Sequence, residues 1–473
     1  MKKREKYAIR SYLFGKNYRD LWDTIVGSFR GTYNSGANAF RHIIDPETPM
    51  IFSRILMTVY YAVLMVAIFT FGFIFTTIFS IIHVIVVTIM MTFVYLVFVF
   101  FAGLDKLYRT IKQISNTCPS CQRKYSLPVY HCPTCGAPHR YLYPSSYGIF
   151  YHKCTCGTKL PTLLINGRHK LEGTCPLCDA PAFKGINHST IFPVFGGRSC
   201  GKTCFINSAI SEIERMAPSL KAQFNYYYGV ANDDRLAIKE RMEQGYLPDS
   251  THENNLKFYN FTFTPNGKKR IANFISVCDI NGETFQQRER ISKQVGYRYA
   301  DSIIFVLDPL AITEFRDEVI NQGYDVASYA GSDQEISDIL GAMLTTLEEM
   351  HRKKKTKINL IVAFTKGDLE PFDKILGQKA VDAYAKAKKG LSKMEARDAL
   401  AQKFLMDYGE SNALKLIQNY FTSVHYFVTS AVGKNHEDGT SFEPIDTAYP
   451  LLWVIDEAYK NLNFDKQLWK GVK

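Results

Sequence analysis

No charged side chain occurs between Ile55 and Gly103, which is 49 consecutive residues in a chain of 473. This absence excludes a water-exposed surface for the stretch, because the surfaces of soluble domains carry charge throughout. As a single helix the stretch would extend about 73 Å, more than twice the roughly 30 Å core of a bilayer. We therefore predict a transmembrane hairpin of two spans, near 55–76 and 82–102. A buried helical hairpin of a soluble protein is the alternative.

Polar side chains are also scarce in this stretch, and the cluster of Thr76, Thr77, Ser80 and His83 near its middle marks the expected turn. His83 has no ionisable partner in the spans, which argues against a proton relay. The run starts too late and is too long for a cleaved signal peptide. Basic residues flank it on both sides, so both ends are predicted to face the cytoplasm at the inner membrane. These flanking residues are Lys2, Lys3, Arg4, Lys6, Arg10, Arg41, Arg54, Lys106, Arg109 and Lys112.

Acidic residues are few in the parts of the chain that border the apolar stretch. Residues 1–54 hold ten Lys or Arg and five Asp or Glu, and residues 105–184 hold eleven and three, which leaves about −1 of the net +12 for the rest. Basic charge beside an apolar stretch favours a membrane surface over nucleic acid as partner. At helical spacing before the stretch lie Leu21, Trp22, Ile25, Val26 and Phe29. This segment is expected either to lie on anionic lipid or to pack against the protein's own domains.

Eight of the eleven cysteines lie between residues 118 and 178, in closely spaced pairs. Pairs at this spacing on tight turns bring thiolates together around a tetrahedral zinc ion. We expect the first two pairs to form one zinc ribbon and the last two a second, with His152 as an alternative ligand there. Disulfides are the competing interpretation, but thiols stay reduced on the predicted cytoplasmic side. The predicted ligands of two structural Zn²⁺ ions are Cys118, Cys121, Cys132, Cys135, Cys154, Cys156, Cys175 and Cys178.

Residues 196–203 read G-x-x-x-x-G-K-T and follow the strand-like segment 190–195. In this motif backbone N–H groups surround phosphate oxygens, the lysine reaches the β and γ phosphates, and the threonine hydroxyl holds Mg²⁺. Cys200 lies at a helix N-terminus, which lowers a thiol pKa. It either fills a variable position of the motif or, as a hypothesis, is a thiol whose oxidation blocks nucleotide binding. The predicted phosphate-binding residues are Gly196, Gly197, Arg198, Ser199, Cys200, Gly201, Lys202, Thr203 and Cys204.

A strand-like run over 271–278 ends in Asp279, and Gly282 follows three residues later. A D-x-x-G string at a strand end supplies an acid for the Mg²⁺ shell and a glycine N–H for a γ-phosphate. The next apolar run, 303–307, has the composition of a strand buried in a parallel sheet.

Two more strand-like runs end in polar strings: 358–364 enters Thr365-Lys366-Gly367-Asp368, and 424–428 enters Thr429-Ser430-Ala431. Together with the phosphate loop and D-x-x-G, this order resembles that of the TRAFAC-type, Ras-like P-loop GTPases over about residues 187–462. The resemblance implies an α/β fold with a mostly parallel sheet that binds GTP and Mg²⁺.

The resemblance also implies roles for the residues of the polar strings. Asp368 would accept hydrogen bonds from the N1 and N2 groups of guanine, and Lys366 would stack along the base, with Thr365 in place of the commoner Asn. The backbone of Ser430 and Ala431 would contact guanine O6.

Catalytic and Mg²⁺-binding roles follow in the same way. Thr251 is the predicted switch threonine that closes over Mg²⁺. Glu283 stands where many relatives carry a water-positioning Gln, and its charge predicts slow hydrolysis or a need for a partner. The predicted catalytic residues are Lys202, Thr251 and Glu283, and the predicted Mg²⁺ ligands are Thr203, Thr251 and Asp279.

A narrower resemblance rests on the Gly-x-Leu-Pro-x-x-Thr pattern over residues 245–251 and on the joined zinc ribbons and spans. These features resemble the double-GTPases of bacterial conflict systems, and the resemblance implies a role in defence. The predicted segments are 1–54 basic and cytoplasmic, 55–103 transmembrane hairpin, 104–186 two zinc ribbons and 187–473 GTPase domain.

We therefore predict a membrane-anchored GTPase that acts as a nucleotide-dependent switch or assembly module. Its expected partners are the membrane, GTP and an unknown protein effector or activating protein, with self-association as an option and no nucleic acid. Two alternatives remain open at this point. One is a zinc-ribbon scaffold or adaptor whose nucleotide domain binds without turnover, and the other is a channel-like effector gated by GTP.

Overall fold

The computed structural model divides into two compact units, and each is described separately. Unit 1 comprises residues 1–112 and 129–174, and unit 2 comprises 113–128 and 175–473. Within these limits the structure describes residues 6–45, 50–112, 114, 116–121, 123–182, 185, 187–227, 230–248, 257–265, 272–279, 300, 302–326, 329, 334–351, 358–388, 390–433 and 440–459. The four-segment division expected from the sequence stays a prediction.

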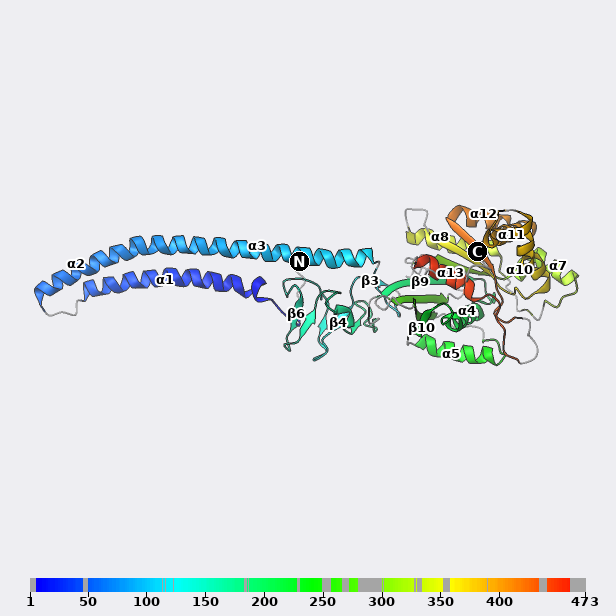
Figure 1. The fold of residues 1–473 in the computed structure, drawn as a ribbon, viewed down its shortest axis with the longest axis horizontal. Coiled ribbons are helices and arrows are strands. Elements are labelled where there is room, and N and C mark those ends of the chain that lie inside the picture. Colours follow the sequence, from blue (N-terminus) through cyan, green and yellow to red (C-terminus); the bar gives the residue numbers. More distant parts are fainter. Residues whose placement is uncertain are drawn as a thin grey trace. The chain divides into compact units, whose positions relative to one another are not determined.

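One long apolar helix dominates unit 1 (Figure 1). It consists of α2 (Ile51–Ala67), the π-helical turn η2 (Ile68–Gly72) and α3 (Phe73–Ile111), which follow one another without a break. Its 61 residues form the only helix among the described residues that is long and apolar enough to cross a membrane. At 1.5 Å per residue, 61 residues extend about 90 Å.

The predicted turn at residues 76–83 is wrong, because these residues lie inside α3 and the expected spans 55–76 and 82–102 belong to one helix. Threonine hydroxyls in this region are satisfied within the helix itself. Thr76 Oγ1 and Thr77 Oγ1 donate to the carbonyls of Gly72 and Phe73, at 2.8 and 2.7 Å. A polar residue that bonds the carbonyl four positions back needs no turn to reach water.

The helix α1 (Lys16–Ile44) packs antiparallel on this long helix. Phe29 contacts Phe73, and a Cβ on Gly36 would lie 2.6 Å from the ring of Phe69, so the two backbones approach closely there. The hydroxyls of Thr32 and Thr76 share a hydrogen bond of 2.8 Å. The segment around Leu21 therefore packs against the protein's own long helix, and its contact with lipid stays a prediction.

A small β module completes unit 1 and holds both ends of the helix pair. Its first sheet joins β1 (Ala8–Ile9), β6 (Tyr151–Cys154) and β7 (Lys159–Pro161), so the chain ahead of α1 is one of its strands. Its second sheet joins β5 (Pro138–His139), β4 (Val129–His131) and β8 (Gly173–Thr174). Two 3₁₀ turns, η1 (Tyr12–Phe14) and η3 (Arg168–Lys170), precede α1 and β8.

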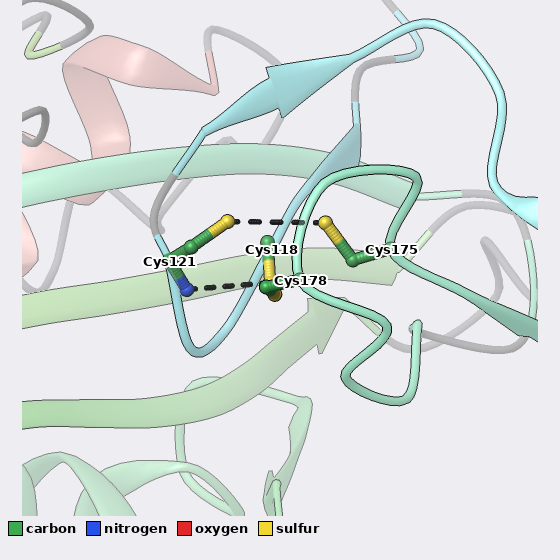
Figure 2. A group of neighbouring side chains, drawn as sticks. All are labelled: Cys118, Cys121, Cys175 and Cys178. Carbon is green, nitrogen blue, oxygen red and sulfur yellow. Dashed lines mark hydrogen bonds between the residues drawn. The ribbon is translucent and has the colours of Figure 1, made fainter.

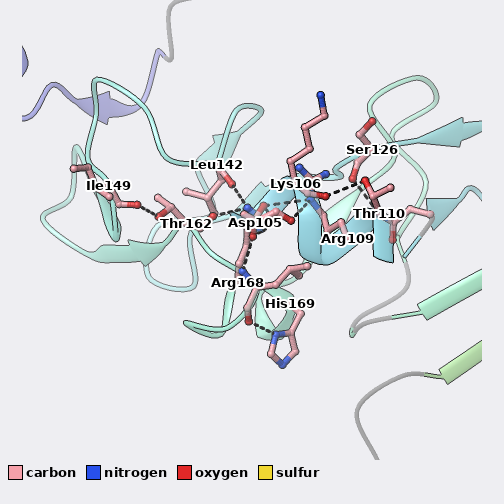
Figure 3. A network of polar contacts seen from close by, with 12 residues as sticks. Asp105, Lys106, Arg109, Thr110, Ser126, Leu142, Ile149, Thr162, Arg168 and His169 are labelled. Carbon is pink, nitrogen blue, oxygen red and sulfur yellow. Dashed lines mark hydrogen bonds and ion pairs between the residues drawn. The ribbon is translucent and has the colours of Figure 1, made fainter. Parts of the chain in front are cut away.

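The far end of α3 is fixed to the same module by a buried ion pair (Figure 3). Asp105 accepts from Arg168 Nη2 at 3.0 and 3.3 Å and from the backbone N–H of Leu164 at 3.1 Å. The Arg168 side chain is fully buried, and its Nη1 donates to the carbonyls of Leu142 and Thr162. Arg109 contacts Asp105 from the partly exposed side, at 3.2 Å.

Unit 2 is built on a seven-stranded sheet in the order β10-β11-β12-β9-β13-β14-β15. The five strands from β12 to β15 are parallel, and β10 and β11 are antiparallel additions at one edge. The expectation of a mixed α/β fold with a mostly parallel sheet is therefore confirmed. The bounds are β9 (Asn187–Gly196), β10 (Ala222–Tyr226), β11 (Lys257–Pro265), β12 (Ala272–Asp279), β13 (Ser302–Leu307), β14 (Asn359–Phe364) and β15 (Ser423–Val428).

Helices cover both faces of this sheet because its central strands are apolar on both sides (Figure 1). Ile304 and Val306 of β13 face a core shared with α4 and α13, whereas Ile303 and Phe305 face a core shared with α7, α8, α9, α11 and α12. The helices are α4 (Lys202–Met216), α5 (Val230–Glu243), α7 (Thr313–Asn321), α8 (Ile336–His351), α9 (Glu370–Leu376), α10 (Gln378–Ala387), α11 (Lys393–Asp407), α12 (Ser411–Tyr420) and α13 (Ala448–Ala458), with the 3₁₀ turn η6 (Pro309–Ala311) and the short strands β2 (Asn116–Thr117) and β3 (Lys124–Tyr125).

The buried ion pair gives a prediction for unit 1. Replacing Arg168 by Gln leaves the Asp105 carboxylate buried without its main partner, which typically costs about 3–5 kcal/mol. Arg109→Gln removes a partly exposed partner of the same carboxylate and should cost about 1 kcal/mol or less. Hydrogen exchange of the amides in 129–174, measured on the full-length protein, should be much faster in the first variant only. Equal exchange in both variants would contradict the assigned role of Arg168.

Candidate functional site

The phosphate-loop motif connects β9 to α4 at the carboxyl edge of the sheet. Gly201 has φ +87° and precedes the first residue of α4, so this position favours glycine. A Cβ on Gly196 would lie 2.2 Å from the carbonyl oxygen of Val306 in β13, so only glycine fits there. Glycine at these two positions permits the tight turn over the strand end that a phosphate cradle needs.

Lys202 lies inside this loop and is 8% exposed. Its Nζ donates to the carbonyl oxygens of Gly196 and Gly197, at 3.0 and 2.5 Å. A lysine in this position has its charge balanced by loop carbonyls and can exchange them for phosphate oxygens. The loop therefore fits a polyphosphate group in residue type and in backbone conformation.

Asp279 ends β12 and meets the first turn of α4. Thr203 Oγ1 donates to Asp279 Oδ2 at 3.1 Å. Burial raises the pKa of the Asp279 carboxyl, while Lys202, Thr203 and Lys257 act in the opposite direction. A hydroxyl and a carboxylate in contact at the end of a phosphate loop are the oxygen ligands that Mg²⁺ takes alongside phosphate.

The string Thr365 to Asp368 follows β14 on the same edge of the sheet. Thr365 Oγ1 donates to the carbonyl of Cys200 at 3.1 Å, which ties this string to the phosphate loop. Gly367 N–H donates to the carbonyl of Thr429 at 2.9 Å, and a Cβ on Gly367 would lie 2.6 Å from Val428 Cγ1. The string and the end of β15 are thus in direct contact.

Asp368 is half-buried in this loop. Ser430 and Ala431, in the segment that follows β15, are buried. Ser430 N–H donates to the carbonyl of Ile445 at 2.9 Å, and Ser430 Oγ accepts from Gly433 N–H at 2.8 Å. The Ser430 groups are therefore engaged within their own loop. The parallel strands bring all these predicted residues to one edge of the sheet.

Several predicted residues lie outside the described part of the chain. These are the switch threonine Thr251, the D-x-x-G glycine Gly282 and the water-positioning candidate Glu283. The loop residues Gly197, Arg198, Ser199 and Cys204 are described, and Ser199 has a positive φ of +55° in the turn.

The sequence did not single out two residues that contact the site, nor a tyrosine that responds to the charge of Asp368. Asp308 is fully buried after β13, and its Oδ2 accepts from Lys366 Nζ at 2.6 Å. Gln334 Oε1 accepts from the backbone N–H of Arg198 in the phosphate loop at 3.0 Å. Burial and the charge of Asp368 raise the pKa of the Tyr329 hydroxyl. The carboxylate at the end of the 303–307 run was the one available signal, and it pointed to Asp308.

Burial argues against a reactive thiol at Cys200, and the effect of its oxidation on nucleotide binding stays a prediction. Cys200 is 1% exposed, and burial raises the pKa of its thiol more than the nearby Lys202 lowers it. Burial likewise raises the pKa of Cys204 to about 12. Desolvation disfavours a thiolate, which is the form that reacts with oxidants.

The eight paired cysteines form two groups of four, each with its Sγ atoms within 4.8 Å of one another. The distances between paired Sγ atoms are 3.4 Å (Cys118–Cys178), 3.8 Å (Cys121–Cys175), 3.6 Å (Cys132–Cys156) and 3.6 Å (Cys135–Cys154). A disulfide is about 2.05 Å long, whereas the edge of a ZnS₄ tetrahedron with Zn–S bonds of about 2.3 Å is about 3.8 Å. The thiols therefore fit two Zn²⁺ ions.

The expected grouping of the pairs is wrong, because the two sites are nested. The outer site takes the first and last pairs, Cys118, Cys121, Cys175 and Cys178, and belongs to unit 2 (Figure 2). The inner site takes the two middle pairs and belongs to unit 1. The reason is the antiparallel pairing of β4 with β8, which brings residues 129 and 174 together and so closes the chain between the outer pairs.

His152 is not a ligand of the inner site. It is fully buried, its Nε2 shares a hydrogen bond of 2.9 Å with Ser145 Oγ, and burial lowers its pKa to about 4. Cys154-x-Cys156 supplies both thiols despite its short spacer, because the two residues flank the end of β6.

The phosphate loop, the strand-end carboxylate and the polar strings on one edge of a parallel sheet define a P-loop nucleotide-binding domain. Residues 190–412 match the model of the family described as Double-GTPase 2. Unit 2 therefore contains a P-loop GTPase domain of the double-GTPase type, a GTP-binding switch module, as the resemblance predicted. A comparison with curated protein sequences gives no match.

Among solved structures the chain is similar to Roco2 RocCORdC of Methanosarcina barkeri bound to GDP, with 12% identity over 57% of this chain and 49% of that one, and a TM-score of 0.23. It is similar to the GTPase-like domain of S. cerevisiae Ski7 bound to GTP, with 15% identity over 58% and 50% and a TM-score of 0.27. A septin GTPase domain from Chlamydomonas reinhardtii gives 12% identity over 44% and 64% and a TM-score of 0.18. The chain spans about half the length of the first two, and at these TM-scores the similarity carries no argument about the site.

The nested grouping gives a prediction for metal content. Cys118→Ser with Cys175→Ser damages only the outer site, so this double variant should keep about one Zn²⁺ per chain. Cys118→Ser with Cys132→Ser damages both sites and should keep about none. Elemental analysis of protein purified without chelator measures both. Sequential pairing of the motifs would reverse the two results.

The buried carboxylate gives a prediction about pH. The folded state holds a proton on Asp279 more tightly than the unfolded chain, so the free energy of unfolding falls as pH rises from the ordinary carboxyl pKa of about 3.9 through the raised value. Asp279→Asn removes this loss and should raise the unfolding temperature of the nucleotide-free protein above that pH window, while weakening Mg²⁺-dependent GTP binding. The exposed Asp317→Asn serves as control. An unfolding temperature that does not rise in Asp279→Asn would contradict the role given to burial.

Proposed function

We propose that the protein is a membrane-anchored GTPase that hydrolyses GTP slowly and acts as a nucleotide-dependent switch or assembly module. The observation that carries the nucleotide part is the contact of Thr203 with Asp279 beside Lys202 at the mouth of the phosphate loop. The membrane part is supported by the long apolar helix of unit 1. Zinc at the two cysteine sites would stabilise segments too short for a core of their own.

Within the nucleotide site we assign roles to this chain's residues. Backbone N–H groups of 196–204 bind the phosphates, Lys202 neutralises β and γ oxygens, and Thr203 with Asp279 holds Mg²⁺. When bound, Mg²⁺ supplies charge neutralisation between the β and γ phosphates. Thr251 and Gly282 complete the shell around the γ-phosphate, and Glu283 orients the attacking water.

For the base, we assign Asp368 to the N1 and N2 groups of guanine. A carboxylate accepts from two donors on one edge of the base, and adenine has no such pair of donors. Lys366 and Thr365 position the base and the loop, and Thr365 is supported by its hydrogen bond to Cys200. Of the Ser430–Ala431 pair, Ala431 is our candidate for guanine O6, because Ser430 N–H already donates to Ile445.

Slow turnover follows from Glu283, whose negative charge lies next to the γ-phosphate in this assignment. Comparable GTPases without an arginine supplied by a partner turn over at about 10⁻⁴ to 10⁻² per second. We propose that an activating protein stimulates hydrolysis and that the output is effector binding at the cytoplasmic face of the inner membrane. By resemblance, we place this activity in bacterial conflict systems.

The guanine assignment is tested by Asp368→Asn in the full-length protein. The variant should lose affinity for GTP by at least tenfold and gain affinity for xanthosine triphosphate, because the amide presents a donor where the carboxylate accepts. Glu370→Gln, an exposed change two residues away, is the matched control and should leave both affinities unchanged. Fluorescent nucleotide binding with Mg²⁺ measures this, and phosphate release in the same samples separates a slow GTPase from a scaffold without turnover. Equal loss of GTP and xanthosine triphosphate, or ATP preference in the wild type, would sink the assignment.

A further inference from the structure

The long helix of unit 1 exposes apolar side chains away from α1 along its whole length. Leu56, Val63, Ile74, Ile85 and Leu96 are each between 52% and 65% exposed. Their spacings of seven and eleven residues are near whole numbers of helical turns, so they form one stripe. A different side of the helix carries the residues that contact α1, among them Phe69, Phe73 and Thr76. The stripe therefore lies outside the surface that the partner helix covers.

The outer side of α1 has the opposite character. Arg19, Asp23, Arg30 and Arg41 are exposed and lie on the side of α1 away from Phe29 and Gly36, the residues that contact the long helix. Between the polar and apolar sides runs a line of exposed large residues: Tyr18, Trp22, Tyr33 and Phe40. Aromatic side chains with a polar group favour the boundary between hydrocarbon and water. The helix pair is thus amphipathic as a whole, with an aromatic edge.

A bilayer-crossing position conflicts with this arrangement. Contacts of α1 with the long helix run from His42–Tyr61 to Asn17–Met91, so α1 accompanies the most apolar part of the helix throughout. Any crossing segment would carry charged groups of α1 into hydrocarbon, where isolated charges are costly. About 90 Å of helix is also far longer than the roughly 30 Å core, and the remainder would leave apolar side chains in water.

The charge of unit 1 identifies the surface that fits. Residues 1–112 and 129–174 hold 18 Lys or Arg and seven Asp or Glu, a net +11 out of the chain's +12. Basic residues are attracted to anionic lipid headgroups. A second copy of the chain packed on the stripe would cover one side of the long helix and leave its apolar flanks exposed. Lipid would cover the stripe and both flanks at once.

We propose that the helix pair lies in the plane of one anionic leaflet, with the stripe of α2–α3 in the hydrocarbon, the aromatic line at its boundary and α1 toward the headgroups. This inference rests on the membrane association proposed above and replaces two crossing spans by none. Both ends of the pair stay on one side of the membrane, in agreement with their attachment to one β module through β1–β6 and Asp105–Arg168.

The depth of tryptophan in vesicles tests the orientation. The background is full-length protein with Trp22→Phe and Trp469→Phe, which retains Trp453, a residue buried in unit 2. Single tryptophans are introduced by Leu56→Trp, Ile74→Trp and Leu96→Trp, all at exposed positions of the stripe. Vesicles of phosphatidylcholine and phosphatidylglycerol carry bromine either near the headgroup or near the chain end. The measured quantity is the ratio of deep to shallow quenching. Unchanged hydrogen exchange of the amides in 129–174 verifies that unit 1 is folded in each variant.

An in-plane helix predicts the same ratio at all three positions and a shallower ratio for Trp22 in a Trp469→Phe protein. Greatest depth at position 74 with shallow ends would overturn the inference while leaving membrane association intact. Failure of the wild type to float with the vesicles would overturn membrane association itself. Quenching at none of the positions in a chain that floats would place the stripe against another copy and also overturn the inference. Vesicles without phosphatidylglycerol should retain several-fold less protein.

Discussion

The path of the chain between residues 118 and 178 depends on one constraint, the meeting of two cysteine pairs that are more than fifty residues apart. Cys121 and Cys175 are 54 residues apart in sequence, and their sulfurs lie 3.8 Å apart. Between the outer pairs the chain leaves unit 2 after residue 128 and returns to it at residue 175, and the pairing of β4 with β8 brings these two points together. Metal at the outer site would hold together the two ends of the chain segment between the outer pairs. The folding of the β module and the formation of the outer site are linked, because both bring these ends together.

The same module determines what the helix pair can do. The chain enters α1 from a strand of the module, and α3 ends on the buried Asp105–Arg168 pair within it. The start of α1 and the end of α3 are thus attached to one module, and the two helices pack on each other between these points. The helix pair has two distinct long sides, and sequence gives them opposite character, charged on α1 and apolar on α2–α3. The side of the helix pair that a partner or a membrane meets is therefore set by the attachment of both helices to the β module, and not by the apolar helix alone.

Sequence predicted those parts of the protein whose signal is local or tied to a strand end. The phosphate loop, Asp279, Thr365 to Asp368 and the 430–431 pair follow apolar runs, and parallel pairing necessarily collects such ends at one edge. The two errors concern long-range pairing. A polar cluster at 76–83 indicates a turn only if its hydroxyls need water, and Thr76 and Thr77 bond their own helix. Cysteine spacing fixes the pairs but not which pairs meet, because that depends on β4 and β8. The residues Asp308 and Gln334 were missed for the same reason, since their contacts cross between elements.

The charged groups of the nucleotide site are balanced within the protein, and this shapes how it can respond to ligand. Lys202 is held by its own loop carbonyls, Lys366 by Asp308, and Asp279 by Thr203. Phosphate alone would have to draw Lys202 from two carbonyls while facing the Asp279 carboxylate. A cation alone would have to favour ionised Asp279, whose pKa is raised by burial, beside the lysine charge. Triphosphate and Mg²⁺ together remove both obstacles, because each neutralises the group that opposes the other. Under the proposed function, the site would therefore respond to the Mg²⁺–nucleotide complex as a unit, which is the behaviour a switch requires.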